Sequence, residues 1–349
     1  MKRIIATALC LIMIASLTLT SCSSPKSETV FAYGDVSVDE NMFYYLLSLM
    51  KTEMLEQYSG ATTDVPALWM QSLGNDVTFD DYAYAQCQVN ICTMIFYADY
   101  ALQHGGELTK EQKQAIKKQA DGIVEKFGSK AALNKYLETY AINYDMLCDY
   151  YELKTLCDIG RSIAYGEGGE MAIPYEDMWT YYRNNFVTVK HIAIGTEFAG
   201  TDEDGNYLYY TEEQKEAKQL LIDTILTALE NGEDFDKYVE YSEDGFKNTY
   251  PNGYTITKGV LDSSMEGYEN LAFSLAEGEW DTFELEGTSV FIVKRVPLLE
   301  TDFLNCVSTI ANKLIEADMA QTIVENINSF TKNQDILNRY SMSIMPVIN

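Results

Sequence analysis

Apolar residues recur with two different spacings along this chain. Up to residue 185 they mostly repeat every three to four positions, which predicts a largely helical region. From Val187 to Pro297, alternating β-branched runs stand between shorter helical patterns, which predicts a block of mixed strands and helices. Beyond Pro297 the helical spacing returns, and we expect one long helix from about Asp302 to Lys332.

The helical region begins with two short β-like runs in Thr29–Val38, which are separated by a turn at Gly34 and Asp35. Asp39 is expected to cap a helix that continues to about Gln57. The later helices are expected at residues 79–103, 109–127, 130–140, 144–165 and 175–185, with a glycine-rich break at 166–170.

The central block predicts the order β, α, α, β, α, β, β. Its helices are expected at residues 212–230, 235–241 and 269–275. Its strands are expected at residues 187–194, 254–257, 283–285 and 290–296, the last two forming a hairpin.

Met1–Ser21 is predicted to be a targeting segment, because two basic residues precede an apolar run, Ile4–Leu19, that is short for a membrane span. The run ends in Leu19-Thr20-Ser21-Cys22, which resembles a bacterial lipobox. That resemblance implies that Cys22 is lipidated and becomes the first residue of the mature protein. The alternative is an ordinary secretory signal in which Cys22 is incidental. Residues 22–28 are expected to be a flexible tether.

Charge and composition argue against several classes of function. The chain has 53 acidic and 25 basic residues, a net charge of −28, so nucleic acid is not expected as a partner. There is no Cys-x-x-Cys and no cluster of cysteine with histidine, so neither a metal nor another cofactor is expected. His104, beside two glycines at a helix end, is expected to be structural. Five cysteines are expected to be buried thiols, namely Cys87, Cys92, Cys148, Cys157 and Cys306.

An ordered series of short sequence motifs in the central block resembles the parvulin (PpiC-type) family of peptidyl-prolyl isomerases. With the lipobox and the helical flanks, the whole chain resembles a PrsA- or SurA-type extracytoplasmic foldase. The motifs are Val189-Lys190-His191-Ile192, Gly232-x-x-Phe235, Ser242-x-Asp244, Asn252-Gly253-Tyr254-Thr255, Lys258-Gly259, Tyr268-Glu269-x-x-Ala272-Phe273-x-Leu275, Gly278-Glu279 and Phe291-Ile292-Val293-Lys294.

The resemblance implies an α+β protein in which a parvulin-like domain, residues 186–297, is inserted into a helical chaperone domain. That domain would span residues 29–185, with 298–349 returning as a helix to pack on it. A four-stranded antiparallel sheet with surrounding helices is expected in the insert. The implied partners are unfolded or partly folded secreted polypeptides with Xaa-Pro bonds and, through the lipid, the outer side of the cell membrane. A second copy of the chain, in a homodimer, is a further candidate partner.

The resemblance also implies site residues. His191 matches the family's first-strand histidine, and Asp244 matches a polar position after the second helix; both would be catalytic. The proline pocket would be formed by Tyr268 and Phe273, together with the family's methionine position. Two residues match that methionine position, depending on whether spacing is counted from Gly259 or from Tyr268; they are Leu261 and Met265.

The last strand departs from the family pattern, because Phe291 stands where the family usually has a second histidine. Phe291 would then line the pocket, and His191 would need another hydrogen-bond partner or would be a satisfied core histidine. For Asp244, capping of a helix beside Gly245 is the alternative role.

Two functions therefore remain open from the sequence. The first is a membrane-anchored foldase that catalyses peptidyl-prolyl cis-trans isomerisation. The second is a holdase with a parvulin fold and little or no isomerase activity, which the phenylalanine at position 291 favours. A solute-binding lipoprotein would agree with the predicted lipid anchor but not with the sequence motifs of the central block.

Overall fold

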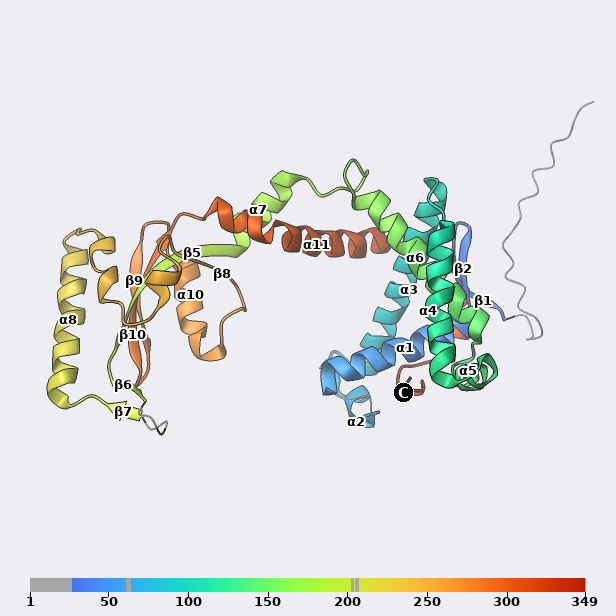
Figure 1. The fold of residues 1–349 in the computed structure, drawn as a ribbon, viewed down its shortest axis with the longest axis horizontal. Helices are drawn as coiled ribbons and strands as arrows, with labels where there is room; N and C mark the ends of the chain where they lie inside the picture. The colour runs from blue at the N-terminus through green and yellow to red at the C-terminus, as the bar shows by residue number, and fades with distance from the viewer. Residues whose placement is uncertain (1–26, 61–63, 202–203, 205–206, 349) are drawn as a thin grey trace, which may run out of the picture. The chain divides into compact units, whose positions relative to one another are not determined.

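The computed structural model describes residues 27–60, 64–201, 204 and 207–348. Cys22 and the predicted targeting segment lie outside these residues. The described chain is an α+β protein that divides into two compact units (Figure 1). The helical unit contains the described residues up to Ala172 and from Ile315 onward, and the sheet unit is Ile173–Leu314.

Helices dominate the helical unit, and most of them begin where the sequence predicts. A three-stranded antiparallel sheet of order β11-β1-β2 joins β1 (Thr29–Tyr33), β2 (Val36–Asp39) and β11 (Thr331–Lys332). The remaining elements are α1 (Glu40–Ser59), α2 (Pro66–Trp69), β3 (Ser72–Gly74), β4 (Val77–Thr78), α3 (Phe79–Gln103), α4 (Lys110–Phe127), α5 (Lys130–Leu137), the short 3-10 helix η1 (Glu138–Tyr140), α6 (Tyr144–Tyr165) and α12 (Gln334–Leu337).

Side-chain caps set the helix starts. Asp39 accepts the Met42 N–H at 2.9 Å at the start of α1, as expected. Thr109 and Gln112 form a reciprocal capping box that starts α4. At the end of α1, Gly60 adopts a left-handed φ of 67°, a conformation that glycine reaches without steric cost.

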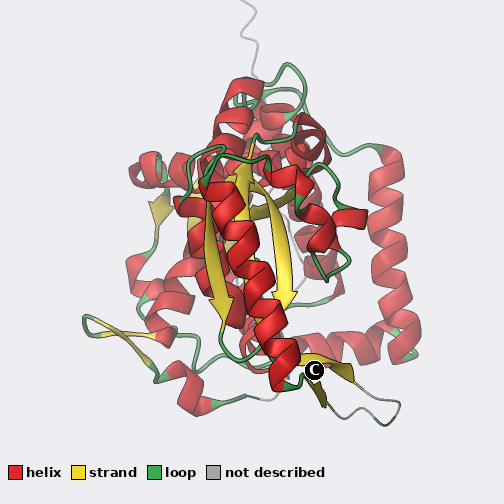
Figure 2. Cartoon of the chain, turned by 90° about the vertical axis from the view of Figure 1, so that its left-hand side faces the viewer, coloured by secondary structure: helices red, strands yellow, loops and turns green. Residues whose placement is uncertain are grey.

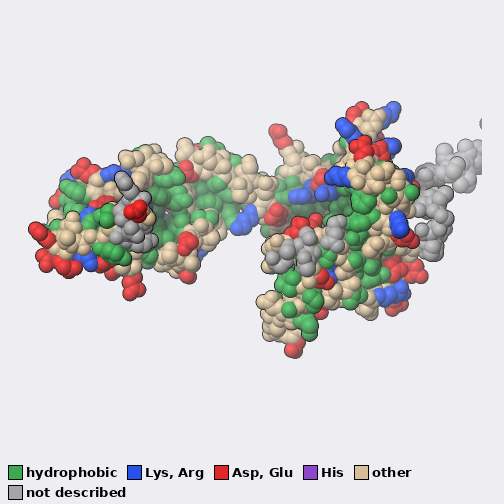
Figure 3. Space-filling model, turned by 60° about the horizontal axis from the view of Figure 1, so that its bottom comes forward, with side chains coloured by type: hydrophobic (Ala, Val, Ile, Leu, Met, Phe, Trp, Pro, Cys, Tyr) green, Lys and Arg blue, Asp and Glu red, His purple; other side chains and the backbone are tan. Residues whose placement is uncertain are grey.

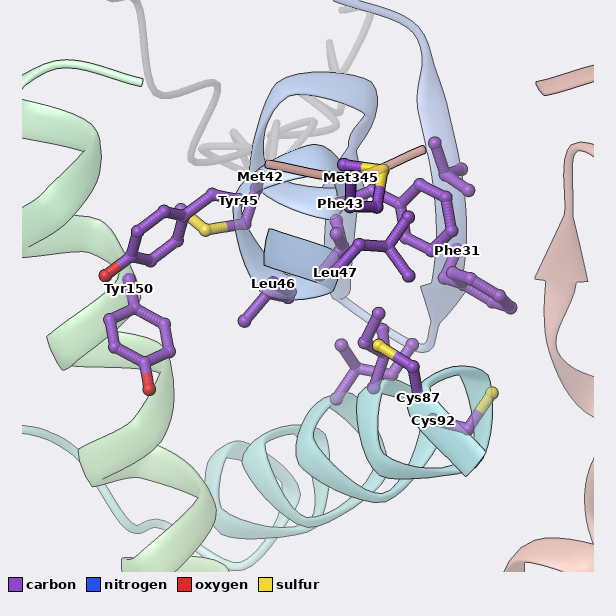
Figure 4. Packing of buried hydrophobic residues seen from close by; sticks show 14 of the residues in the cluster. Phe31, Met42, Phe43, Tyr45, Leu46, Leu47, Cys87, Cys92, Tyr150 and Met345 are labelled. Carbon is purple, nitrogen blue, oxygen red and sulfur yellow. The ribbon is translucent and has the colours of Figure 1, made fainter. Parts of the chain in front are cut away.

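One large apolar core holds the helical unit together. Figure 4 shows α1 side chains such as Phe43 and Leu47 between the β1 residue Phe31 and the α3 residues Cys87 and Cys92. Both cysteines are buried, as predicted, whereas the other three, Cys148, Cys157 and Cys306, are only half-buried; all five are free thiols.

The long helix after Pro297 is shorter than predicted. The structure has α11 at Glu300–Glu325, and a 3-10 turn, Ile327–Ser329, follows it. The prediction of helix as far as Lys332 was wrong, because Phe31 and Ala32 of β1 pair with Lys332 and Thr331 as a strand. The backbone hydrogen bonds of this segment therefore go to a sheet.

The sheet unit is built on a four-stranded antiparallel sheet of order β8-β5-β10-β9. Its strands are β5 (Phe186–Gly195), β8 (Tyr254–Thr257), β9 (Trp280–Leu285) and β10 (Ser289–Val296). Figure 2 shows this sheet with helix α8 in front of it. The other elements are α7 (Tyr175–Asn185), the hairpin strands β6 (Phe198–Thr201) and β7 (Tyr207–Tyr209), α8 (Glu212–Glu230), the 3-10 turns η2 (Phe235–Lys237), η3 (Val239–Tyr241) and η4 (Ser263–Met265), α9 (Phe246–Thr249) and α10 (Glu266–Ser274).

Each face of this sheet has its own core, since neighbouring strand residues point to opposite faces. Ile192 and Ile194 pack with Ile222 and Ile225 of α8 on one face. On the other face, Val187 and Val189 pack with Tyr268, Ala272 and Leu275 in and after α10. Position 191 of β5 falls on this second face, which is how the sequence directs His191 toward α10.

The compact sheet unit is longer at both ends than residues 186–297. Helix α7 and the first half of α11 belong to it, because Tyr182 and Phe303 are fully buried against each other with their ring centroids 5.4 Å apart. Among the described residues, every helix is too short or too polar to cross a bilayer.

Candidate active site

His191 lies in β5 with Val293 of β10 directly opposite it. Its side chain is 7% exposed, so both ring nitrogens need partners. Nδ1 is 2.7 Å from the hydroxyl of Tyr268, and Nε2 is 2.5 Å from Oδ2 of Asp244. The structure therefore brings together His191, Asp244 and Tyr268, three of the residues that the sequence proposes for the site.

Ser242 fixes the Asp244 carboxylate through the oxygen that does not bond His191. The Ser242 hydroxyl donates to Oδ1 of Asp244 at 2.8 Å and accepts the backbone N–H of Ala193 in β5 at 2.9 Å. The loop that carries Asp244 is thus tied to the strand that carries His191. Gly245 stands at the N-cap of helix α9 and provides no side-chain cap, although the Phe246 N–H also faces the Asp244 carboxylate.

Two pKa shifts describe the electrostatics of the site. Burial alone would raise the pKa of Asp244, but hydrogen bonds from His191 and Ser242 outweigh it, and the pKa lies below its ordinary value. Burial, and then the charge of Asp244, raise the pKa of Tyr268. Tyr268 therefore keeps its proton, which it can donate to Nδ1 while Nε2–H donates to Asp244.

We predict that the sheet unit loses stability in acid through Asp244. A carboxyl whose pKa is lowered by folding stabilises the fold above its ordinary value of 3.8, and this contribution disappears as the pH falls through the lower folded pKa. Hydrogen exchange of the Ile192 and Val293 amides, followed from pH 6 to pH 3, measures this stability. The fall should be smaller in Asp244→Asn; an equal fall in the two proteins would contradict the prediction.

An apolar wall adjoins the histidine on the α10 side. The rings of Phe291 and Tyr268 lie 5.4 and 5.7 Å from the imidazole, and those of Tyr268 and Phe291 are 5.6 Å apart. Leu261 and Met265, the two candidates for the methionine position, both pack, half-buried, against this same core. Phe273 is half-buried farther along α10, where the Lys258 ammonium lies 5.1 Å from its ring.

Two aromatic residues of the site were not proposed from the sequence. Phe246 of α9 lies beside His191 at a centroid distance of 4.9 Å and contacts Tyr250 and Tyr254. Phe283 of β9 reaches Tyr268 over Gly267, where a Cβ would be only 2.5 Å from the Phe283 ring. No sequence motif indicated either ring, because both reach the site through packing between segments that are far apart in the sequence.

The described residues contain no group of three or more His, Cys, Asp or Glu side chains arranged to hold a metal ion. His104 lies in the helical unit, where it stacks on Tyr100 at 3.9 Å and bonds the Tyr100 carbonyl through Nδ1. It makes the helix-end contacts expected of a structural histidine.

No family model matches the sequence, and no curated protein matches it significantly. Among solved structures, the chain is similar to the peptidylprolyl isomerase PrsA of Bacillus cereus, with 16% identity, 90% of this chain and 93% of that chain covered, and a TM-score of 0.28. It is also similar to the foldase PrsA of Lactococcus lactis, with 13% identity, 90% and 99% covered, and a TM-score of 0.27.

A third solved structure, the foldase PrsA of Streptococcus pneumoniae, has 14% identity, covers 78% of this chain and 98% of that chain, and gives a TM-score of 0.24. All three of these solved structures are named PrsA.

Proposed function

We propose that this chain is an extracytoplasmic foldase whose sheet unit catalyses peptidyl-prolyl cis-trans isomerisation. The observation that carries the proposal is the geometry of His191. Its imidazole is held between an ionised carboxylate, Asp244, and a protonated phenol, Tyr268, and it borders an apolar wall. An apolar surface for a proline ring beside a fixed polar network is what this reaction requires.

The reaction needs no cofactor and no covalent step. Rotation about a peptide bond meets a barrier of about 18–20 kcal/mol, because the amide loses its conjugation in the twisted state. A site that binds the proline ring on apolar side chains and offers prearranged dipoles to the twisted amide lowers that barrier. In this chain the ring would lie against Leu261, Met265 and Phe291, and the His191–Tyr268–Asp244 network would face the amide.

A holdase without isomerase activity is the second candidate, and one observation favours it. Both nitrogens of His191 already have partners within the protein, and Phe291 contacts the ring edge in place of a polar group. The imidazole can therefore bond a substrate only by giving up Asp244 or Tyr268. This cost reduces the catalytic gain, so we expect weak isomerase activity.

Exchange spectroscopy on a short Xaa-Pro peptide tests this proposal. The full chain should accelerate cis-trans exchange measurably and should also suppress aggregation of an unfolded protein. Phe291→His, which restores a polar side chain beside His191, should raise the exchange rate. A chain that suppresses aggregation but leaves the exchange at its uncatalysed rate would establish the holdase instead.

We further propose that the protein is anchored to the outer side of the cytoplasmic membrane by lipid on Cys22. The support is the charged start, the short apolar run and the Leu19-Thr20-Ser21-Cys22 ending. Mass spectrometry of the protein from the membrane fraction should show a lipidated Cys22 as the first residue. A freely soluble protein with an unmodified terminus elsewhere would refute the anchor.

A further inference from the structure

The helical unit binds one of its own segments as though it were a peptide ligand. This segment, Ser341–Ile348, is called the strap below, and it has no regular secondary structure. Met342 and Met345 are 0% and 3% exposed, whereas Ile344 between them is 63% exposed. In Figure 4, Met345 lies beside Phe43 in the core of the unit. The strap thus inserts two flexible apolar side chains and leaves the intervening one in solvent.

Side chains of the helical unit grip the strap by its backbone. The Lys51 ammonium of α1 donates to the carbonyls of Ser343 and Met345 at 3.1 and 2.9 Å. Asp80 of α3 accepts the N–H groups of Met342 and Ser343 at 2.6 and 3.2 Å, and the Ser343 hydroxyl as well.

Two more side chains continue the grip along the strap. Thr52 of α1 accepts the Ile348 N–H at 2.8 Å, and the Tyr140 hydroxyl of η1 donates to the Val347 carbonyl at 3.1 Å. Contacts to backbone groups do not depend on the sequence of the strap. Methionine side chains also fill irregular apolar space adaptably. The strap itself turns at Met342–Met345, where the Met345 N–H bonds the Met342 carbonyl at 3.2 Å, and another segment that adopts this turn with apolar residues three positions apart could make the same contacts.

The buried charge of Lys51 determines what a competing segment must supply. Lys51 is fully buried, with Asp64 at 2.8 Å and the Trp69 ring at 5.3 Å, and the strap supplies its other partners. A segment that displaces the strap must therefore supply two carbonyl groups to Lys51, because a buried charge without hydrogen-bond partners is costly.

An open aromatic surface adjoins the grip. Phe79, next to Asp80, stacks on Trp69 and contacts Tyr58 and Tyr82, which are 53% and 45% exposed. Figure 3 shows that both apolar and acidic side chains reach the surface of the helical unit. An incoming segment can contact these rings before it displaces the strap. The surrounding carboxylates favour segments with Lys or Arg; in residues 51–82 they belong to Glu53, Glu56, Asp64, Asp76, Asp80 and Asp81.

We propose that Lys51, Thr52, Asp80 and Tyr140 form a peptide-binding groove that the strap occupies in the resting chain. Its ligand is an apolar and basic segment of an unfolded polypeptide, which displaces the strap. This inference rests on the chaperone part of the proposed function and is independent of the isomerase site.

A fluorescent peptide with the strap's own sequence, SMSIMPVI, tests the groove in the full chain. Met342→Asn/Met345→Asn should release the strap and strengthen binding of the peptide about tenfold or more over wild type. Adding Asp80→Ala to the released chain should weaken binding about tenfold or more, since hydrogen bonds to a charged acceptor are lost. Adding Glu125→Ala, an exposed carboxylate of α4 outside this surface, should leave binding unchanged. A folded, released chain that does not bind the peptide would overturn the groove.

If the released chain fails to fold, the groove can be tested in the wild-type chain. An excess of carboxymethylated lactalbumin, which stays unfolded, should speed hydrogen exchange at the Met342, Ser343 and Ile348 amides. Amides that stay equally protected while the client is bound would overturn the groove. Loss of isomerase activity alone would count against the proposed reaction, whereas the peptide measurements would stand.

Discussion

His191→Ala is expected to lower the catalysed rate of Xaa-Pro isomerisation by two to three decades, which brings it close to the uncatalysed rate. Removing one prearranged polar group from a site costs about 3 kcal/mol of transition-state stabilisation. Here the substitution also leaves Asp244 and Tyr268 without the partner that joins them. Exchange spectroscopy on the same peptide, with substrate binding measured separately, reports the loss.

Lys190→Ala supplies the matched control for this substitution. Lys190 is the preceding residue of β5, but it points to the other face of the sheet and pairs with Asp236 at 2.9 Å. Its removal should leave the rate unchanged. If His191→Ala and Lys190→Ala behave alike in an active wild type, the assignment of the site to this face is wrong.

Gly160→Ala is expected to destabilise the helical unit by about 3 kcal/mol, the upper part of the usual range for overpacking. Gly160 is buried in α6, and a Cβ there would be 1.8 Å from the Tyr97 carbonyl oxygen of α3. Because that neighbour is backbone, the two helices must move apart. Urea unfolding followed by the tyrosine fluorescence of the full chain measures the change.

Gly122→Ala is the control, since it makes the same substitution inside a helix with free space around it. A Cβ at Gly122 of α4 meets nothing within 4 Å. Alanine there should stabilise the unit by about 0.4–1 kcal/mol, through helix propensity and a less flexible unfolded chain. Equal effects of the two substitutions would show that α3 and α6 are not in the close contact described above.

Local signals allowed the sequence to predict much of the fold. Helices α3, α6 and α8 begin and end where they were expected, because a capping residue stands at each start and the apolar spacing continues to the last turn. The end of α11 was missed, since whether Thr331 and Lys332 form a strand depends on β1, far away in sequence. The contact of Tyr182 with Phe303 was missed for the same reason.

The candidate site, like the fold, could be predicted only in part from the sequence. The parvulin resemblance supplied His191, Asp244 and Tyr268, and the alternation of apolar residues predicted the strand that carries His191. What the sequence could not supply was the partner that replaces the missing histidine. That partner follows from the position of α10, which brings the Tyr268 hydroxyl to Nδ1, and from Ser242, which fixes Asp244.

The central strand of the three-stranded sheet has a consequence for synthesis of the protein. Strand β1 pairs with β11, so the ladder joins Phe31 to Lys332. A chain made from its N-terminus cannot complete this contact until nearly all of it has emerged, whereas the sheet unit, Ile173–Leu314, is one continuous segment. Closing so long a loop is slow because contact order is high. During its own biogenesis, the protein would therefore pass through a stage at which the sheet unit is native and the helical unit still exposes its core, and it would need the same protection from aggregation that we propose it gives to others.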